Sequence, residues 1–589
     1  MSRPPADQMP PGIPFIVANE FAERFCYYGI NAILAVYMTQ HLQFGQAKAT
    51  EWQSLFKFAA YFFPLIGAIL SDVFWGKYRT IMTLAVVYTA GCAIIALDMG
   101  PVFMGVGLGL MAFGTGGIKP CVSTNVGDQF TSKTQHLIER AFSYFYLSIN
   151  IGSSISIYFC PIWLDAYGPK VAFGVPAAAM ALATIAFRLG RDRFVVVPPA
   201  MTQDAAKGVA LFVLALVPVL GFSGWVYTAF SPEYRTFAAL MTLLLLLALV
   251  VVVSLKTGVR DALPTELRQW LEEAFTGDSL RQIAALGVLY YLFVAMFFSL
   301  WEQSNGQTWT LQATSDLMDK HLFGFLAGIP ALGVLASYEM LAAQIQVVNG
   351  LLILVLIPIF TFIIYPVMGR FFTVTPLRKI GIGLWVIASS YLIIAMIEQR
   401  IMNGITVSLW WQILAYVVLT AAEVLVSITC LEFSYRQAPL KLKSFIMAAT
   451  YLCCQSVGNA FTAQVNSAMV KPLSVQEVVT GSETWVKFAD VSQFQRGQKI
   501  DFDGDTGLQM EGGERGLNGT FLIADIEPAQ NRVRLADTVH RAPVVSTGAF
   551  KADTAKVSTY KLVGPDYFLF FAGAGVLAAV GFMFAAGFY

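Results

Sequence analysis

The stretch Glu20-Phe-Ala-Glu-Arg-Phe-Cys-Tyr-Tyr28 lies near the start of an otherwise apolar segment that runs from about 14 to 38. The segment is long enough for a membrane helix of roughly 20 residues, yet it contains two carboxylates and a guanidinium. Each charge costs about 2.5 to 3.5 kcal/mol at the centre of an inserted helix, so these charges must be paired or hydrated. At helical spacing a polar stripe forms on one face from Glu20, Arg24, Tyr27, Tyr28 and Asn31. A polar stripe on a membrane helix predicts a substrate or ion pathway.

The composition of the chain is that of a polytopic membrane protein. Of its 589 residues, 57% are hydrophobic and 13% are charged, whereas soluble domains have about 45 to 50% apolar and 25% charged residues. The net charge of +1 and the lack of a basic run interleaved with aromatics argue against nucleic-acid binding. The 7 cysteines lie in apolar stretches without the paired spacing of a metal or redox site. We therefore expect no metal and no cofactor.

Apolar runs of about 20 residues predict an all-α membrane protein with about fourteen spans. Lysine and arginine gather in alternate loops, which predicts that both termini face the cytoplasm. The expected spans are 14–38, 52–73, 80–98, 101–122, 140–162, 170–189, 207–229, 236–255, 282–303, 343–368, 379–397, 409–431, 444–466 and 566–588.

The order of these spans divides the chain into five parts. One part differs from the rest, because its apolarity drops and it shows strand-like alternation with turn signals, which predicts a small β-rich insertion on the periplasmic side. The parts are an N-terminal six-helix bundle (1–193), an inserted helix pair with an amphipathic linker (194–275), the first five helices of a C-terminal bundle (276–470), the β insertion (471–563) and the last membrane helix (564–589).

One acidic run of the β insertion resembles part of a metal site. Asp501-Phe-Asp503-Gly-Asp505 is similar to the start of a calcium-binding loop. The glycine is displaced from the position that such a loop requires, and Gly512 stands where the closing glutamate belongs. We therefore expect a solvated acidic turn here.

The loop after the second expected span reads Gly67-Ala-Ile-Leu-Ser-Asp72-Val-Phe-Trp-Gly76-Lys77-Tyr-Arg79. Its small residues let helices approach closely, and its charges can latch a helix end to a neighbour as a breakable gate. The loop resembles the signature loop of the major facilitator superfamily. That resemblance implies two six-helix bundles, to which this chain would add an inserted helix pair.

Further motifs narrow the resemblance. They are the Glu-x-x-Glu-Arg-Phe-x-Tyr-Tyr pattern at 20–28 and the stretches 114–120, 127–130, 142–152 and 432–439. Together they resemble the proton-dependent oligopeptide transporter (POT/PTR) family, and the inserted helix pair resembles its bacterial members. The resemblance implies a proton-coupled symporter that imports di- and tripeptides by alternating access. We expect it to be a monomer among the lipids of a bacterial inner membrane.

The charged residues of the spans suit a peptide zwitterion. A buried site needs cations for the carboxylate of the peptide and an anion for its amine. Arg24 and Lys119 are intramembrane cations of the N-terminal half, and Glu423 is an intramembrane anion of the C-terminal half. A peptide between them would clamp the two bundles together. The resemblance implies the same three assignments and adds Asn150 and Asn349 as polar contacts, with a structural hydrogen bond between helices as the alternative for an amide.

Proton coupling needs a carboxylate whose protonation is linked to a neighbouring cation. Glu20 and Glu23 beside Arg24 and Lys119 form one such cluster, for which a structural ion-pair network is the alternative. Glu302 of the ninth span is the second candidate, with a gate salt bridge that does not titrate as the alternative. Many family members have an arginine where this chain has Asn31. Glu302 therefore lacks its expected partner, and it either pairs elsewhere or is neutral more often.

Aromatic residues can line side-chain pockets that accept many peptides without hydrogen-bond readout. The candidates are Tyr27, Tyr28, Tyr61 and Phe298. For Phe298, plain helix packing is the alternative.

Two other functions stay open at the level of sequence. The first is a carrier of the same fold for another solute, such as nitrate or a drug, although a simple anion has no amine for Glu423 to bind. The second is a membrane receptor that uses the β insertion. An enzyme is the least expected function, because no catalytic triad or metal cluster stands within helical reach.

Overall fold

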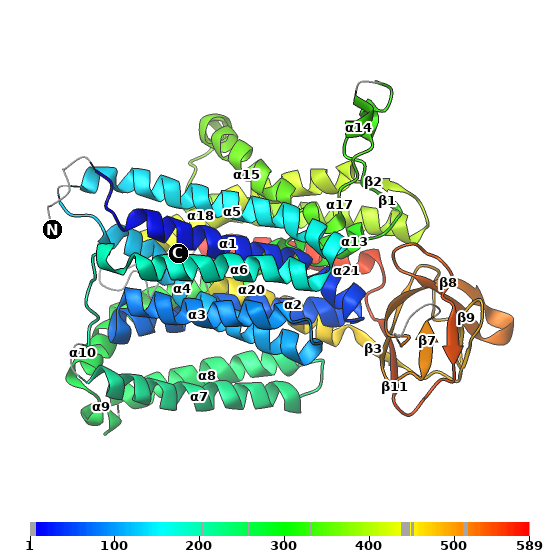
Figure 1. The fold of residues 1–589 in the computed structure, drawn as a ribbon, viewed down its shortest axis with the longest axis horizontal. Coiled ribbons are helices and arrows are strands. Elements are labelled where there is room, and N and C mark those ends of the chain that lie inside the picture. The colour runs from blue at the N-terminus through cyan, green and yellow to red at the C-terminus, as the bar shows by residue number, and fades with distance from the viewer. Residues whose placement is uncertain are drawn as a thin grey trace.

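The structure is a computed structural model that describes residues 8–132, 134–201, 204–256, 258–329, 332–437, 448, 453–510 and 516–587. The end of the 432–439 motif, the start of the span expected at 444–466 and Gly512 lie outside the described residues. Long helices run side by side, and a small β domain lies at one end of them, opposite to the end where the chain starts (Figure 1). We call this end of the helices the β-domain end.

The first six long helices form the N-terminal bundle. α1 packs against α5 and α6, and α3 packs against α4 and α6. α2 packs against α4 and also against α20 of the other half, so α2 lies at the interface between the bundles. The helices are α1 (Ile13–Val36), α2 (Gln46–Ile69), α3 (Lys77–Ala96), α4 (Pro101–Asp128), α5 (Ile138–Tyr167) and α6 (Pro169–Leu189).

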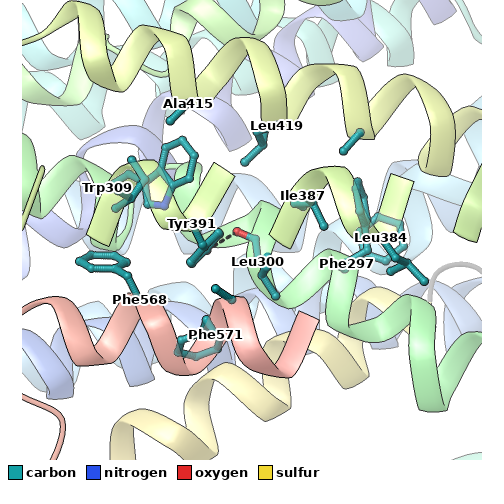
Figure 2. Close-up of a cluster of buried hydrophobic side chains, with 14 of the residues drawn as sticks. Phe297, Leu300, Trp309, Leu384, Ile387, Tyr391, Ala415, Leu419, Phe568 and Phe571 are labelled. Carbon is teal, nitrogen blue, oxygen red and sulfur yellow. Dashed lines mark hydrogen bonds between the residues drawn. The ribbon is translucent and has the colours of Figure 1, made fainter. Parts of the chain in front are cut away.

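The C-terminal bundle is built from shorter and longer helices around an aromatic core. Figure 2 shows Trp309, Tyr391 and Phe571, which come from three different helices and lie close together in this core. The helices are α11 (Gly277–Leu289), α12 (Ala295–Ser304), α13 (Thr308–Ala313), α15 (Val347–Ile359), α16 (Tyr365–Phe371), α17 (Pro376–Met402), α18 (Trp410–Gln437), α20 (Cys453–Ala468) and α21 (Pro565–Ala586). The short α14 (Gly333–Ala336) projects from the bundle (Figure 1).

The backbone is unwound between α12 and α13, and this break faces the N-terminal bundle. Gly306 in the break has a φ of +71°, which favours glycine, and a Cβ at this position would lie 2.4 Å from the carbonyl oxygen of Asn31. Tyr391 donates to the carbonyl oxygen of Leu300 at 2.6 Å, and Tyr416 donates to that of Ser304 at 2.7 Å. These hydroxyls fix the end of α12, so the carbonyl groups that follow it are held toward the bundle interface.

Among the described residues, eleven helices are long and apolar enough to cross a membrane. The three other expected spans correspond to α1, α4 and α20. α1 contains three charged residues, α4 has its apolar part only over Pro101–Gly116, and α20 begins directly after residues that are not described. The chain is thus a multi-pass membrane protein made mostly of helices.

The inserted helix pair is formed by α7 (Ala205–Ala229) and α8 (Arg235–Lys256), which pack on each other beside the bundles (Figure 1). It is held to α2 by Glu51, which accepts hydrogen bonds from Tyr227 at 2.7 Å and from Arg235. A short α9 (Val259–Ala262) and α10 (Thr265–Ala274) then lead into α11. α10 occupies the place of the expected amphipathic linker.

The β domain is inserted between α20 and α21. Its main sheet has seven antiparallel strands in the order β3-β11-β6-β8-β9-β5-β4. β3 and β11, the first and last strands of the domain in sequence, pair with each other, so the chain leaves the membrane helices and returns to them at one place. Its strands are β3 (Val470–Leu473), β4 (Glu477–Val479), β5 (Trp485–Lys487), β6 (Lys499–Gly504), β7 (Leu508–Met510), β8 (Gly519–Glu527), β9 (Arg532–Asp537), β10 (Ser546–Gly548) and β11 (Ala555–Tyr560).

The acidic run of this domain differs from the expected solvated turn. Asp501 lies within β6 and its side chain is buried, so the expectation was wrong for this residue. Asp505 follows the strand, is exposed and pairs with Lys551. The difference arises because the start of α2 lies against Asp501, so that a Cβ added at Gly45 would meet the Asp501 side chain, and because Thr520 and Tyr560 donate to its carboxylate.

Candidate substrate and proton site

A buried ion cluster forms on the stretch that begins at Glu20. The Nε atom of Arg24 lies 2.6 Å from Oε1 of Glu20, one helical turn away, and 3.3 Å from Oε2 of Glu23. Thr115 of α4 donates to Oε1 of Glu23 at 2.8 Å. Both carboxylates are buried, whereas the side chain of Arg24 keeps 14% of its surface exposed. The three charges of α1 are therefore paired with one another, as their cost in a membrane requires.

Lys119 of α4 adds a cation with free donors. Its Nζ atom lies 4.1 Å from the ring centre of Tyr27 and 4.3 Å from that of Tyr61, which is cation–π geometry. Within the described part of the chain, Nζ donates no hydrogen bond, and Oε2 of Glu20 accepts none. Lys119 is also within electrostatic range of Glu20, Glu23 and Glu302. An ammonium held only by ring faces has its full hydrogen-bonding capacity left for a ligand.

Glu423 of α18 is the corresponding anion of the C-terminal bundle. Its Oε2 atom accepts hydrogen bonds from Nδ2 of Asn349 at 2.8 Å and from Nε1 of Trp301 at 2.9 Å. Asn349 also donates to the hydroxyl of Thr420 at 2.9 Å. Two donors thus orient one carboxylate oxygen.

Tyr28 connects the two charged regions. It makes an edge contact with Tyr27, with ring centres 5.4 Å apart. It lies within electrostatic range of Arg24 on its own helix and of Glu302 and Glu423 in the other bundle. The cations of the N-terminal bundle and the anion of the C-terminal bundle therefore face a common region.

Glu302 has a basic partner that the sequence analysis did not identify. Nζ of Lys57, on α2, lies 2.9 Å from Oε2 of Glu302, and both side chains are buried. The same ammonium donates to the carbonyl oxygens of Glu302 at 2.8 Å and of Asn305 at 2.9 Å. Of the two alternatives for Glu302, pairing elsewhere or being neutral, the structure shows the first, because Glu302 pairs with Lys57 of α2.

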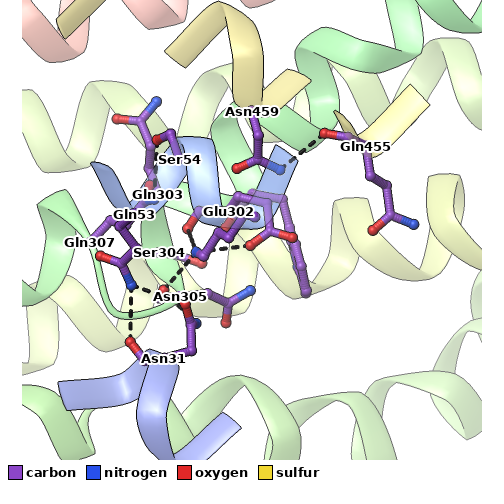
Figure 3. A network of polar contacts seen from close by, with 12 residues as sticks. Asn31, Gln53, Ser54, Glu302, Gln303, Ser304, Asn305, Gln307, Gln455 and Asn459 are labelled. Carbon is purple, nitrogen blue, oxygen red and sulfur yellow. Dashed lines mark hydrogen bonds and ion pairs between the residues drawn. The ribbon is translucent and has the colours of Figure 1, made fainter. Parts of the chain in front are cut away.

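Amide side chains extend this contact between the bundles (Figure 3). Asn31 donates to the carbonyl oxygen of Asn305 at 3.0 Å, and Gln53 donates to the carbonyl and side-chain oxygens of Asn31 at 3.0 Å. Gln307 donates to the hydroxyl of Ser54 at 3.2 Å. Asn31, which replaces the arginine seen in many family members, therefore binds the unwound backbone between α12 and α13. We call Asn31, Gln53, Ser54, Lys57, Glu302, Asn305 and Gln307 the gate network.

Two predicted contact residues lie in other surroundings. Asn150 donates to the carbonyl oxygen of Tyr146 in its own helix at 2.8 Å and lines a cavity of ≈ 790 Å³ between α5 and α15. Phe298 is 2% exposed in the core of the C-terminal bundle, with its ring centre 5.2 Å from that of Phe297.

The signature loop lies at the end of the bundles opposite to the β domain. Gly76 connects the end of α2 to α3 with a φ of +73°, a conformation that favours glycine. Lys77 pairs with Asp128 of α4, whereas Asp72 accepts from the hydroxyl of Ser71 at 3.0 Å. Arg79 is exposed, and Gly67 lies in the last turn of α2.

Two residues of the site, Lys57 and Trp301, were not predicted from the sequence. Lys57 is a single charge within the apolar stretch Phe56-Lys57-Phe58 of an expected span, which is the signal that identified Arg24 and Lys119. For Trp301 the only signal in the sequence is its position directly before Glu302. Its indole donor, absent from phenylalanine, is what reaches Glu423.

Comparison with known proteins gives a consistent result. The model of the POT family matches residues 78–486, which is more than half of the chain. Peptide transporter family 1 of Drosophila melanogaster is 34% identical over 408 residues, which cover 66% of this chain and 48% of that protein. Solute carrier family 15 member 1 of Homo sapiens is 30% identical over 421 residues, which cover 67% and 52%. The chain thus spans about half the length of these curated relatives.

Solved structures agree with this similarity. The POT family transporter PepTSo has a TM-score of 0.62 and 31% identity, with 78% of this chain and 90% of that chain covered. An auto-inhibited POT family peptide transporter has a TM-score of 0.61 and 31% identity, with 78% and 88% covered. The predicted fold class, a major facilitator fold with a β insertion, is confirmed, and so is the predicted family. This chain belongs to the POT family of transporters.

Proposed function

We propose that this protein is a proton-coupled symporter that imports di- and tripeptides by alternating access of its two bundles. The observation that carries the proposal is the pair of opposite charges on either side of Tyr28. Lys119 offers unused donors in one bundle, and Glu423 is held in place in the other. A zwitterion of peptide length satisfies both, whereas nitrate or another simple anion satisfies only the cations.

Each charged residue has a distinct proposed role. Lys119 and Arg24 bind the peptide carboxylate, and Glu423, oriented by Trp301 and Asn349, binds the amine. Since an unpaired buried charge is costly, a bound peptide stabilises the arrangement in which both bundles approach it. Tyr27, Tyr28 and Tyr61 line the space for side chains. For Asn150 and Phe298 we retain a peripheral role as lining residues only.

Proton coupling is assigned to the two groups of carboxylates. In the gate network, protonation of Glu302 removes the charge that holds Lys57, and this weakens the contact between α2 and the break after α12. Glu20 and Glu23 form the second group, because they share Arg24 with the peptide carboxylate. One proton that moves inward supplies about 2.3 kcal/mol per 100 mV, and tenfold accumulation of a solute requires about 1.4 kcal/mol.

For alternating access we assign a gate to each end of the bundles. The gate network joins the bundles at the β-domain end, and its contacts must separate for that end to open. The signature loop with Gly67, Asp72, Gly76, Lys77 and Arg79 is placed at the opposite end, where Lys77 and Asp128 latch two helices of one bundle.

We further propose a bacterial inner membrane as the location, with both termini in the cytoplasm and the β domain in the periplasm. The bias of lysine and arginine toward alternate loops supports this orientation. The proton is the coupling ion, no other cofactor is required, and the transport unit is a monomer.

Reconstituted liposomes test the proposal. A labelled dipeptide should accumulate inside when the outside is acidic and the inside is negative, and a protonophore should abolish the accumulation. Nitrate and a cationic drug serve as alternative solutes under the same gradients. Dipeptide binding without accumulation would support a receptor, and gradient-driven uptake of nitrate alone would overturn the substrate assignment.

A further inference from the structure

The β domain contacts the bundle to which it does not belong in sequence. It is inserted between α20 and α21 of the C-terminal bundle, yet it touches the first turn of α2. The N-cap residue of α2 is Gly45, which provides no side-chain hydrogen bond to the helix. Instead, the N–H of Gln46 donates to the hydroxyl of Thr520 at 2.9 Å, and the N–H of Ala47 donates to the hydroxyl of Tyr560 at 3.4 Å.

Both hydroxyls are backed by one buried carboxylate. Thr520 donates to Oδ1 of Asp501 at 2.7 Å, and Tyr560 lies 2.8 and 2.7 Å from the two oxygens of the same residue. Each hydroxyl donates a hydrogen bond to the carboxylate, so its own oxygen can accept a hydrogen bond from an N–H of α2. Asp501 therefore caps the N-terminus of α2 indirectly, through the two hydroxyls, and places an acidic group at the positive end of the dipole of this helix.

The same domain is also fixed to the C-terminal bundle. Lys499 of β6 lies 3.3 Å from Glu398 of α17, and His540 lies 2.7 Å from Asp316, which follows α13. The exposed pair of Lys48 with Asp503 adds a further, weak contact to α2. The β domain thus spans the two bundles at the end where the gate network closes.

α2 connects this contact to the gate. Its first turn is held by the β domain, and Gln53, Ser54 and Lys57 of the gate network follow two to three turns later on the same helix. Separation of Lys57 from Glu302 requires α2 to move away from the C-terminal bundle. While the β domain remains fixed to that bundle, the same movement must break the bonds of Gln46 and Ala47.

From this arrangement we infer that the β domain is a strap of the transport cycle. Asp501 is a positioning residue that, through Thr520 and Tyr560, holds α2 in the closed position. Opening of the β-domain end requires release of this cap together with the gate network. The inference rests on the proposed alternating access and adds to it a third component outside the bundles.

Hydrogen exchange of the full-length protein in lipid nanodiscs tests the strap. Thr520→Val keeps the shape of the side chain and removes one of the two hydroxyls that connect Asp501 to α2. The double variant Thr520→Val with Tyr560→Phe removes both hydroxyls. The matched controls are Thr554→Val and Asp505→Asn. They change a hydroxyl and a carboxylate of the same domain whose hydrogen bonds, among the described residues, lie within the β domain. Two segments are followed, namely the first turn of α2 and the gate backbone at 305–307.

If the strap exists, both segments exchange at least about tenfold faster in the double variant, faster to a smaller extent in Thr520→Val, and at the wild-type rate in the controls. Faster exchange in the first turn alone would overturn the inference, because the cap would then be local. Unchanged exchange in both segments would overturn it as well. The Thr520→Val protein decides the matter if the double variant does not fold. Since exchange needs no solute, the result is independent of whether the protein carries peptides.

Discussion

Replacement of Lys57 by methionine removes the buried ion pair of the gate network. Methionine keeps much of the length of the side chain but removes an ion pair and two hydrogen bonds to carbonyl oxygens. Because both side chains are buried, the carboxylate of Glu302 is left uncompensated. Removal of one partner of a buried ion pair costs about 3 to 5 kcal/mol. At about 1.4 kcal/mol per factor of ten, the equilibrium between closed and open gate shifts by roughly a hundredfold to a thousandfold or more.

The distance between the bundles can be measured with spin labels at Ala166→Cys on α5 and Asn403→Cys at the end of α17. Both positions are exposed, and native cysteines are mostly buried, so a protein without the added cysteines gives the background. Lys57→Met should move the distribution of distances toward longer values. Addition of Glu302→Gln should bring part of it back, because the uncompensated charge is then gone.

Lys170→Met, which removes an exposed lysine of α6, is the control and should not change the distances. An unchanged distribution in Lys57→Met would refute the gate assignment. If the double variant were as open as the single one, the effect would come from packing and not from the unpaired carboxylate.

Three further predictions concern the site, the strap and the gate backbone. Trp301→Phe removes one donor to Glu423 and should weaken dipeptide binding by roughly tenfold to a hundredfold in competition assays, with the exposed Trp385→Phe as control; equal affinity would contradict the role of the indole. Burial raises the pKa of Asp501 to about 6, although Lys499 and the Tyr560 hydroxyl oppose this and Asp503 adds to it. The folded protein therefore holds this proton more tightly than the unfolded chain, and the free energy of unfolding should fall by up to about 3 kcal/mol between pH 4 and 7 in thermal unfolding experiments. Asp501→Asn should remove this pH dependence; the same pH dependence in both proteins would disprove the assignment. Gly306→Ala should lengthen the distance between the labelled bundles, because its Cβ would lie 2.4 Å from the carbonyl oxygen of Asn31, whereas Gly328→Ala, with nothing within 4 Å, should not; equal distances would count against the close approach.

Site residues could be predicted from the sequence where a charge interrupts an apolar segment, because such a charge is costly in a membrane. Charges in an apolar segment are expensive, so Arg24 and Glu20 stood out, and the structure places them in contact with each other. Lys57 carried the same signal in its span but lay outside the motifs that drew attention. With Asn31 on α1 in place of the arginine of many family members, Glu302 was expected either to pair elsewhere or to be neutral more often, and its partner is Lys57 of α2.

Other parts of the structure leave no local pattern in the sequence. The contact between the first turn of α2 and the β domain joins residues more than 450 positions apart, such as Gln46 and Thr520. Asp501 was expected in a solvated turn, since the acidic run 501–505 lacks the glycine position and the closing glutamate of a calcium-binding loop. It is buried where α2, a helix of the other half of the protein, begins against its strand, and only the tertiary structure can reveal that neighbour.

Recognition of the two ends of a peptide by opposite charges on the two bundles is the core of the proposed function. It is tested most directly by inhibition of labelled dialanine uptake with dialanine and with N-acetyl-dialanine, in the wild type and in Glu423→Gln. Acetylation removes the charged amine, and a charge-assisted contact is worth about 1.5 to 3 kcal/mol. The wild type should discriminate against the acetylated peptide by at least about tenfold, and Glu423→Gln should lose this discrimination. The same discrimination in both proteins would contradict it.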